Sequence, residues 1–119
     1  MATVFVLEDD HDLRNLYSRA LNFRGHNVAV ASSAAQALDM LYTGDVLPDV
    51  AVLDMSMPGL PGSAVVEFIR NESNLPDLPI IVVSCDDNFR HELRWATVTF
   101  MAKPINLSDL YAAVTKAVS

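Results

Sequence analysis

The sequence has little of several features that would narrow its class. It contains a single cysteine, Cys85, which excludes an intramolecular disulfide framework and a metal site built from clustered cysteines. We expect this residue to face the core or to lie in the first turn of a helix. The sequence opens without a basic segment and a following apolar one, so no signal peptide is visible, and no apolar run approaches membrane-spanning length. These absences favour a protein of the reducing cytoplasm.

Basic residues are also scarce. The chain carries 8 Lys and Arg against 15 Asp and Glu, which gives a formal net charge of -7. This balance argues against non-specific binding to nucleic acid or to an anionic membrane, because phosphate groups would repel the protein. With 119 residues, of which 51% are hydrophobic, we expect one folded domain over residues 1–119.

Short β-branched runs alternate with amphipathic stretches along the chain. This alternation is typical of an α/β protein with a parallel sheet covered by helices on both faces. The predicted strands cover residues 3–7, 27–31, 50–53, 80–83 and 99–102. The predicted helices, with their capping residues, cover residues 10–23, 33–42, 63–71, 87–96 and 106–118. Ser33 with Gln36 forms the pattern of a capping box, and Gly25 is expected to end the first helix.

Polar groups of complementary chemistry follow four of the predicted strands. The first strand runs into Glu8, Asp9 and Asp10, and the others into Asp54, Ser84 and Lys103. Each residue alone has an ordinary interpretation, such as a helix N-cap for Asp10 or a turn residue for Ser84. Together they predict a crevice at the carboxyl ends of the strands. Several carboxylates so close together take up a proton or bind a cation, and oxygen ligands without His or Cys favour Mg²⁺ or Mn²⁺.

The chain resembles the receiver domain of response regulators over essentially its whole length. The resemblance rests on the segments Val6–Asp10, Val52–Gly59 and Val83–Cys85, and on the pair Lys103-Pro104. It implies a doubly wound, flavodoxin-like sheet of five strands in the order 2-1-3-4-5. In such a sheet the winding direction reverses between the first and third strands, where ligands bind.

The resemblance also implies a role for each matching residue. Asp54 is the expected phosphoacceptor, and Lys103 and Ser84 are expected to contact the phosphoryl group. The expected Mg²⁺ ligands are Glu8 through water, Asp9, Asp54 and the backbone carbonyl of Ser56. Ser84 and Phe100 are the expected switch residues, and the bond before Pro104 is commonly cis in the family.

In function, the resemblance implies a two-component or phosphorelay protein. Its donor would be the phosphohistidine of a histidine kinase or a histidine phosphotransfer protein, and the domain would catalyse only its own phosphorylation and dephosphorylation. Ser56 and Asp86, two residues beyond Asp54 and Ser84, are expected to tune the lifetime of the aspartyl phosphate. The switched surface would comprise the fourth helix, the fifth strand and the fifth helix, and it would control an unidentified partner.

The segment between Ser84 and Lys103 departs from the family pattern. It is short and lacks the usual Gly-Ala step before the last strand. We therefore expect a shortened fourth helix or following loop. This departure keeps open an interaction module that acts without phosphorylation. A flavin or nucleotide binder is disfavoured, because the loop after the first strand is acidic and would repel phosphate.

Overall fold

Five parallel strands form one sheet in the order β2-β1-β3-β4-β5. The computed structural model describes residues 2–57 and 59–119. The strands are β1 (Thr3–Leu7), β2 (Asn27–Ala31), β3 (Val50–Asp54), β4 (Ile80–Ser84) and β5 (Thr99–Ala102). The predicted strands and their order are confirmed. The only differences are that β3 and β4 each extend by one residue, which places Asp54 and Ser84 inside the sheet.

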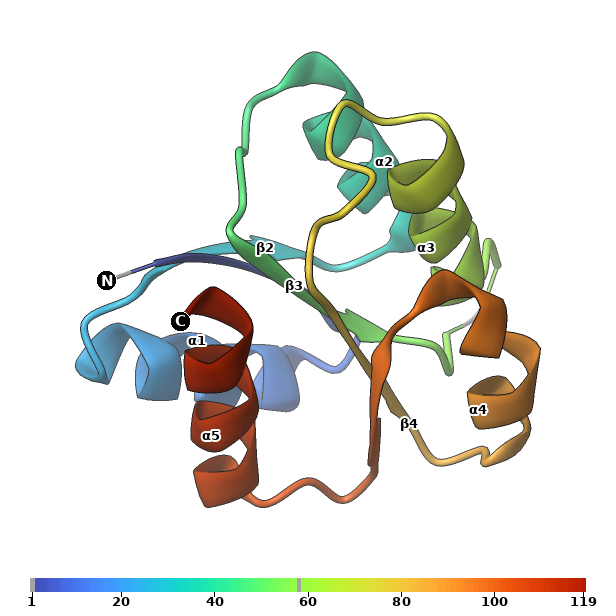
Figure 1. Ribbon diagram of the computed structural model, residues 1–119. Coiled ribbons are helices and arrows are strands. Elements are labelled where there is room, and N and C mark those ends of the chain that lie inside the picture. The colour runs from blue at the N-terminus through green and yellow to red at the C-terminus, as the bar shows by residue number, and fades with distance from the viewer. Residues whose placement is uncertain (1, 58) are drawn as a thin grey trace.

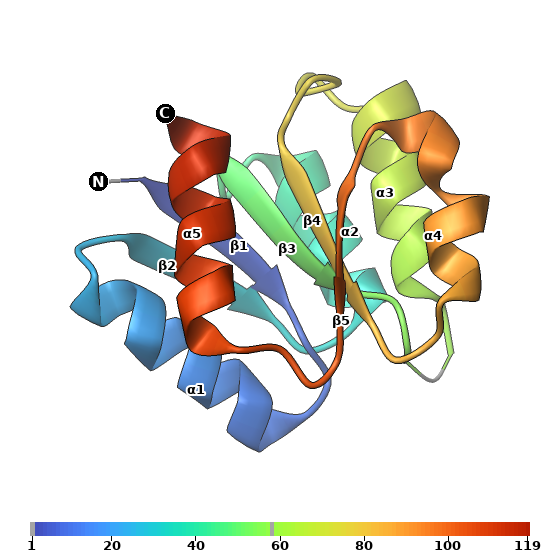
Figure 2. The same cartoon turned by 60° about the horizontal axis from the view of Figure 1, so that its bottom comes forward.

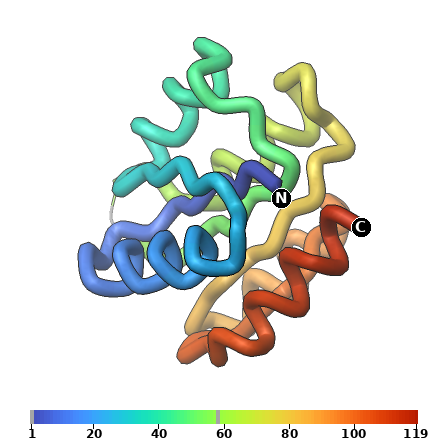
Figure 3. The backbone as a smooth tube through the Cα atoms, turned by 90° about the vertical axis from the view of Figure 1, so that its left-hand side faces the viewer, coloured from blue at the N-terminus to red at the C-terminus, as the bar shows by residue number. Residues whose placement is uncertain are grey.

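Helices cover both faces of this sheet (Figure 1). They are α1 (His11–Phe23), α2 (Ala34–Thr43), α3 (Gly62–Asn71), α4 (Asn88–Glu92) and α5 (Leu107–Val118). One face is covered by α1 and α5, and the other by α2, α3 and α4 (Figure 2). The end of α5 lies at the same end of the molecule as the start of β1 (Figure 3). The α/β architecture expected from the alternating pattern is therefore confirmed.

The helix start signals read from the sequence form as predicted, with one change of partner. Asp10 caps α1, and its carboxylate accepts a hydrogen bond of 3.0 Å from the amide of Leu13. Ser33 caps α2 and accepts a hydrogen bond of 3.1 Å from the amide of Gln36. The side chain of Gln36 accepts its return bond from Ser32, one residue earlier than the capping box predicts. The N-cap interpretation of Asp10 is confirmed.

The core lies on both faces of the sheet because the central strands are buried on both sides. Every residue of β3 and β4 is buried. Continuous β-branched and aliphatic runs suit such strands, since alternate side chains enter opposite faces. This packing fixes where the central strands end, and thus where their last side chains are presented.

The predicted helix over residues 87–96 is present, but it is not one continuous α-helix. The segment forms the five-residue α4, followed by a short 3-10 helix, η1 (Arg94–Ala96). Thr97 then adopts a left-handed backbone with φ of 55° before β5 begins. The expected shortening of the fourth helix is confirmed.

Arg70 of α3 holds the end of this irregular segment. Its guanidinium donates hydrogen bonds to the carbonyls of Ala96 (2.6 Å) and Thr97 (3.3 Å), and to those of Pro76 (2.9 Å) and Leu78 (2.6 Å). Burial lowers the pKa of Arg70. One side chain therefore joins α3, the entry to β4 and the exit from η1, in a region without a regular helix end.

The exposure of Cys85 differs from the prediction. Cys85 is exposed, so the expectation that it faces the core is wrong. It follows the last residue of β4 in a bend, where the alternation of the strand no longer directs side chains inward.

Within residues 2–57 and 59–119, no helix has the length and apolar character needed to cross a membrane.

Replacing Arg70 tests whether the guanidinium anchors the segment after η1. Arg70→Ala should lower the free energy of unfolding by about 1–3 kcal/mol, because it leaves partly buried carbonyls without a donor. Denaturant unfolding measures the loss. The matched control is Arg94→Ala, because Arg94 is exposed and its side chain has no hydrogen bond or ion pair with the described residues. Equal losses in both variants would contradict the anchoring role.

Candidate functional site

The carboxyl ends of β1, β3, β4 and β5 meet at one edge of the sheet (Figure 2). Asp54 and Ser84 are the last residues of β3 and β4, while Glu8 and Lys103 directly follow β1 and β5. The ammonium of Lys103 lies 2.8 Å from Glu8 Oε1 and 3.3 Å from Asp54 Oδ2. Residues up to 95 positions apart in sequence are thus in contact, as the strand-end pattern predicts.

Three carboxylates cluster at this edge. One oxygen each from Glu8, Asp9 and Asp54 lies within 4.8 Å of the others. Glu8 and Asp54 are buried, with side chains 1% and 2% exposed, whereas Asp9 is exposed. Lys103 is the one cation in ion-pair contact with the cluster among the described residues. With all groups ionised, three negative charges therefore face one positive charge.

The burial of these groups changes their acidity. Burial raises the pKa of Glu8, and the neighbouring Asp54 raises it further, against the opposing effect of Lys103. Burial alone would lower the pKa of Lys103, but the hydrogen bond with Glu8 and the charge of Asp54 outweigh it, so this pKa is raised. Lys103 is therefore a permanent cation, whereas the carboxylates repel one another.

The two oxygens of Asp54 have different surroundings. Oδ1 accepts a hydrogen bond of 2.9 Å from the backbone amide of Ser56. Oδ2 is buried and has no hydrogen-bond partner among the described residues, although the ammonium of Lys103 lies nearby. A buried carboxylate oxygen without a hydrogen bond, inside an all-oxygen donor set, fits a hard divalent cation such as Mg²⁺. The residues present thus fit the expected metal.

Ser84 and Ser56 form a hydroxyl contact beside this cluster. Their Oγ atoms lie 3.2 Å apart, and Ser84 Oγ also accepts a hydrogen bond of 2.9 Å from the amide of Asp86. Ser84 is fully buried, whereas Ser56 is exposed. Ser56 therefore touches both Asp54, through its amide, and Ser84, through its hydroxyl. Both serines were expected near Asp54 from the sequence, but no sequence pattern predicts the contact between their hydroxyl groups.

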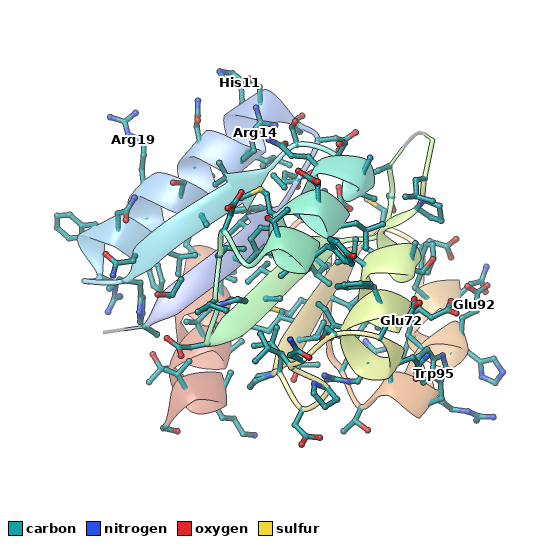
Figure 4. The ribbon with its side chains drawn as sticks, turned by 90° about the horizontal axis from the view of Figure 1, so that it is seen from above. His11, Arg14, Arg19, Glu72, Glu92 and Trp95 are labelled. Carbon is teal, nitrogen blue, oxygen red and sulfur yellow. The ribbon has the colours of Figure 1, made fainter. Side chains whose placement is uncertain are left out.

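Two supporting residues were not identified from the sequence. Arg14, labelled in Figure 4, donates from α1 to the carbonyls of Glu8 (3.0 Å) and Asp9 (3.5 Å) and so orders the acidic loop. Gly62, the first residue of α3, packs directly against the backbone of Asp54. A Cβ at position 62 would overlap the Asp54 carbonyl oxygen and lie 2.9 Å from Met55 Cε. The Pro- and Gly-rich loop before α3 could have pointed to a structural role for Gly62. No pattern in the sequence points to the role of Arg14.

The remaining predicted site residues have mixed outcomes. Phe100 lies half-buried on β5 and pairs in register with Val82, and its role as a switch residue stays a prediction. The bond between Lys103 and Pro104 is cis. Pro58, part of the segment Val52–Gly59, lies outside the described residues. The metal-ligand role of the Ser56 carbonyl stays a prediction.

Comparisons with known proteins agree on one family. The sequence profile described as "Response regulator receiver domain" matches residues 4–115. A similar curated protein is "Response regulator MprA" of Mycobacterium avium (strain 104), which is 32% identical over 112 aligned residues; the match covers 92% of this chain and 47% of MprA. The chain thus spans about half the length of the curated relatives it matches.

Solved structures give the same fold. The Francisella response regulator 1452 receiver domain is 23% identical, has a TM-score of 0.87 and covers 99% of this chain and 97% of its own. The response regulator TrrA from Thermotoga maritima, in complex with Mg(2+)-BeF, is 27% identical. Its TM-score is 0.86, with coverage of 98% of this chain and 99% of its own.

Substituting Gly62 tests whether it sets the position of Asp54. Gly62→Ala should destabilise the fold by about 1–3 kcal/mol, because the added methyl must displace backbone. It should also slow any reaction at the Asp54 carboxylate. The control is Gly44→Ala, which forces a residue with φ of 78° at the remote end of α2 and should cost about 1–2 kcal/mol. If both variants lose stability but react alike, the positioning role of Gly62 is wrong.

Proposed function

The chain belongs to the receiver domain family of two-component response regulators, and from this premise we propose that Asp54 is its phosphoacceptor. The donor would be the phosphohistidine of a histidine kinase or of a histidine phosphotransfer protein. One observation supports the choice of Asp54 most directly. Its Oδ2 is buried, has no hydrogen-bond partner within residues 2–57 and 59–119, and lies 3.3 Å from an ammonium that can neutralise a phosphoryl oxygen.

In the proposed transfer, a carboxylate oxygen of Asp54 attacks the phosphorus of the donor. The bond from phosphorus to the histidine nitrogen breaks, and its electron pair returns to the imidazole, leaving an aspartyl phosphate. Lys103 offsets negative charge on the phosphoryl oxygens, and the Ser84 hydroxyl donates a hydrogen bond to one of them. The protein acts by positioning these groups, since the donor supplies the reactive phosphoryl group.

A divalent metal belongs to this proposal. Asp9 and Asp54 would ligate Mg²⁺, or Mn²⁺ in its place, with Glu8 acting through water and the Ser56 carbonyl as a further ligand. Such a cation reduces repulsion between an anionic carboxylate and an anionic phosphoryl group. The clustering of the three carboxylates and the absence of His or Cys from that cluster support this assignment.

Dephosphorylation would use the same residues. A water molecule attacks phosphorus and the P–O bond to the Asp54 oxygen breaks. Its electron pair restores the Asp54 carboxylate, and inorganic phosphate leaves with the oxygen of the water, whose proton passes to phosphate or to solvent. Ser56 and Asp86 lie beside the acceptor and Ser84, respectively, so they are the residues that would set the access and orientation of this water. We propose that this self-catalysed pair of reactions is the only chemistry of the domain, over residues 1–119.

The output would follow from a movement of Ser84. When its hydroxyl turns toward a phosphoryl group on Asp54, it leaves its contacts with Ser56 and Asp86. Phe100 could then turn toward the space that Ser84 vacates, and the surface of α4, β5 and α5 would change for a protein partner. We place the protein in the cytoplasm, with neither nucleic acid nor membrane as a direct partner.

Intact mass spectrometry tests the phosphoacceptor proposal. Incubation with acetyl phosphate and Mg²⁺ should add one phosphoryl group to most molecules of the wild-type protein. The adduct should be absent from Asp54→Asn and from a sample with EDTA. Folding of Asp54→Asn is checked by circular dichroism.

Two results would contradict the proposal. An adduct that persists in Asp54→Asn would assign the phosphoryl group to another residue. A folded wild-type protein that takes up no phosphoryl group from acetyl phosphate or from a phosphorylated histidine donor would favour an interaction module that acts without phosphorylation.

A further inference from the structure

Phe100 is held between the protein core and a cation. Its inner side packs against the buried cluster that includes Leu93 and Ala96. On the other side, the guanidinium carbon of Arg90 lies 4.3 Å from the centroid of the Phe100 ring. This distance is well inside the range for a cation–π contact. The half-buried ring is therefore covered by an exposed α4 side chain rather than by water alone.

The contact joins α4 to the rest of the molecule at a helix that has few other attachments. None of the five residues of α4 is buried, and among the described residues the side chain of its N-cap, Asp87, accepts no hydrogen bond from a backbone amide. The ion pair of Arg90 with Asp87, at 3.5 Å, stays within the same segment and is exposed. The following η1 is fixed separately, through the hydrogen bond from Arg70 to the carbonyl of Ala96.

The start of α4 is held mainly by Phe89, which packs half-buried against the core, and by the carboxylate of Asp86, which accepts a hydrogen bond of 2.9 Å from the amide of Asn88. The stacking of Arg90 on Phe100 adds a contact between this start and β5.

Ser84 and Phe100 lie on the same face of neighbouring strands. Ser84 pairs in register with Ala102, and Val82 pairs with Phe100, so the hydroxyl and the ring are two positions apart. The small Ala102 is the residue of β5 directly opposite Ser84, two positions after Phe100. Ser84 Oγ also accepts a hydrogen bond from the amide of Asp86, two residues before α4 begins. A movement of Ser84 thus affects both the space beside Phe100 and the segment that carries Arg90.

We infer that Arg90 is a positioning residue that stacks on Phe100 and stabilises the arrangement of the ring seen in this structure. This inference rests on the proposed function, because the Arg90 contact is an interaction that must break when Phe100 moves in the phosphorylated protein. The Arg90 contact opposes rotation of Phe100 away from this arrangement, so breaking the contact favours the phosphorylated state. By linkage, a protein without this contact binds a phosphoryl mimic more tightly.

A titration with beryllofluoride and Mg²⁺, as a mimic of the phosphoryl group, measures this bias. The only tryptophan of the chain, Trp95, lies beside Glu92 at the end of α4 and η1 and reports changes there by fluorescence (Figure 4). Arg90→Gln should lower the half-saturating beryllofluoride concentration about two- to fivefold, the equilibrium equivalent of one exposed cation–π contact. Arg90→Lys should keep most of the wild-type value, because it retains the cation.

The matched control is Arg19→Gln. It removes the same charge from α1, on the side of the molecule away from Trp95 (Figure 4), and should leave the half-saturating concentration unchanged. In a Phe100→Leu background, Arg90→Gln should have no further effect, because the ring on which it acts is gone. Thermal unfolding of each variant separates this bias from a general loss of stability.

The outcomes distinguish a failure of the role inferred for Arg90 from a failure of the proposed phosphoacceptor function. An unchanged half-saturating concentration in Arg90→Gln, or an effect that persists without the Phe100 ring, would overturn the role of Arg90 while the wild-type protein still binds the mimic. A wild-type protein that neither binds beryllofluoride nor takes up a phosphoryl group would overturn the proposed function, and the role of Arg90 with it.

Discussion

The single ammonium of Lys103, set against two buried carboxylates and a third at the surface, is the interaction on which the rest of the structure depends. Its ion pairs with Glu8 and Asp54 join the segments that follow β1 and β5 to the end of β3. They do not balance the charge, because three carboxylates share one cation. Lys103 therefore holds the cluster together, but the cluster keeps a net negative charge. This condition suits a site that takes up a divalent cation and then an anionic phosphoryl group.

The fold makes this imbalance possible. Parallel strands that are buried on both faces must end at the same edge, and the side chains at those ends cannot withdraw into solvent. The backbone of Asp54 is further confined by Gly62, and the acidic loop is ordered by Arg14. The opposite consequence appears around α4, where few buried contacts hold the helix. The molecule thus combines a confined, buried site with a neighbouring helix that has no fully buried residue, and Ser84 contacts the segment between them.

The fold could be predicted from the sequence because its signals are local. Apolar runs such as Thr3–Leu7 and caps such as Asp10 and Ser33 specify their own elements. The site could be predicted because its chemistry lies at strand ends and because the segments around Asp54 and Lys103 resemble a known family. Contacts that depend on tertiary packing were not predicted. The stacking of Arg90 on Phe100, the four carbonyls held by Arg70 and the bond between Ser56 and Ser84 join segments whose spacing carries no pattern.

The central claim, that the excess negative charge forms a cation site, is tested most directly by thermal unfolding with and without Mg²⁺. Mg²⁺ at a hundred times its dissociation constant should stabilise the wild-type protein by about 2.7 kcal/mol and raise its Tm by several degrees. Asp9→Asn should unfold without Mg²⁺ at the same Tm or higher, because a repulsive charge is gone, and should lose the Mg²⁺ response. Asp45→Asn, which removes an exposed charge after α2, should keep it. A wild-type Tm that does not respond to Mg²⁺, or a response that survives in Asp9→Asn, would contradict the account.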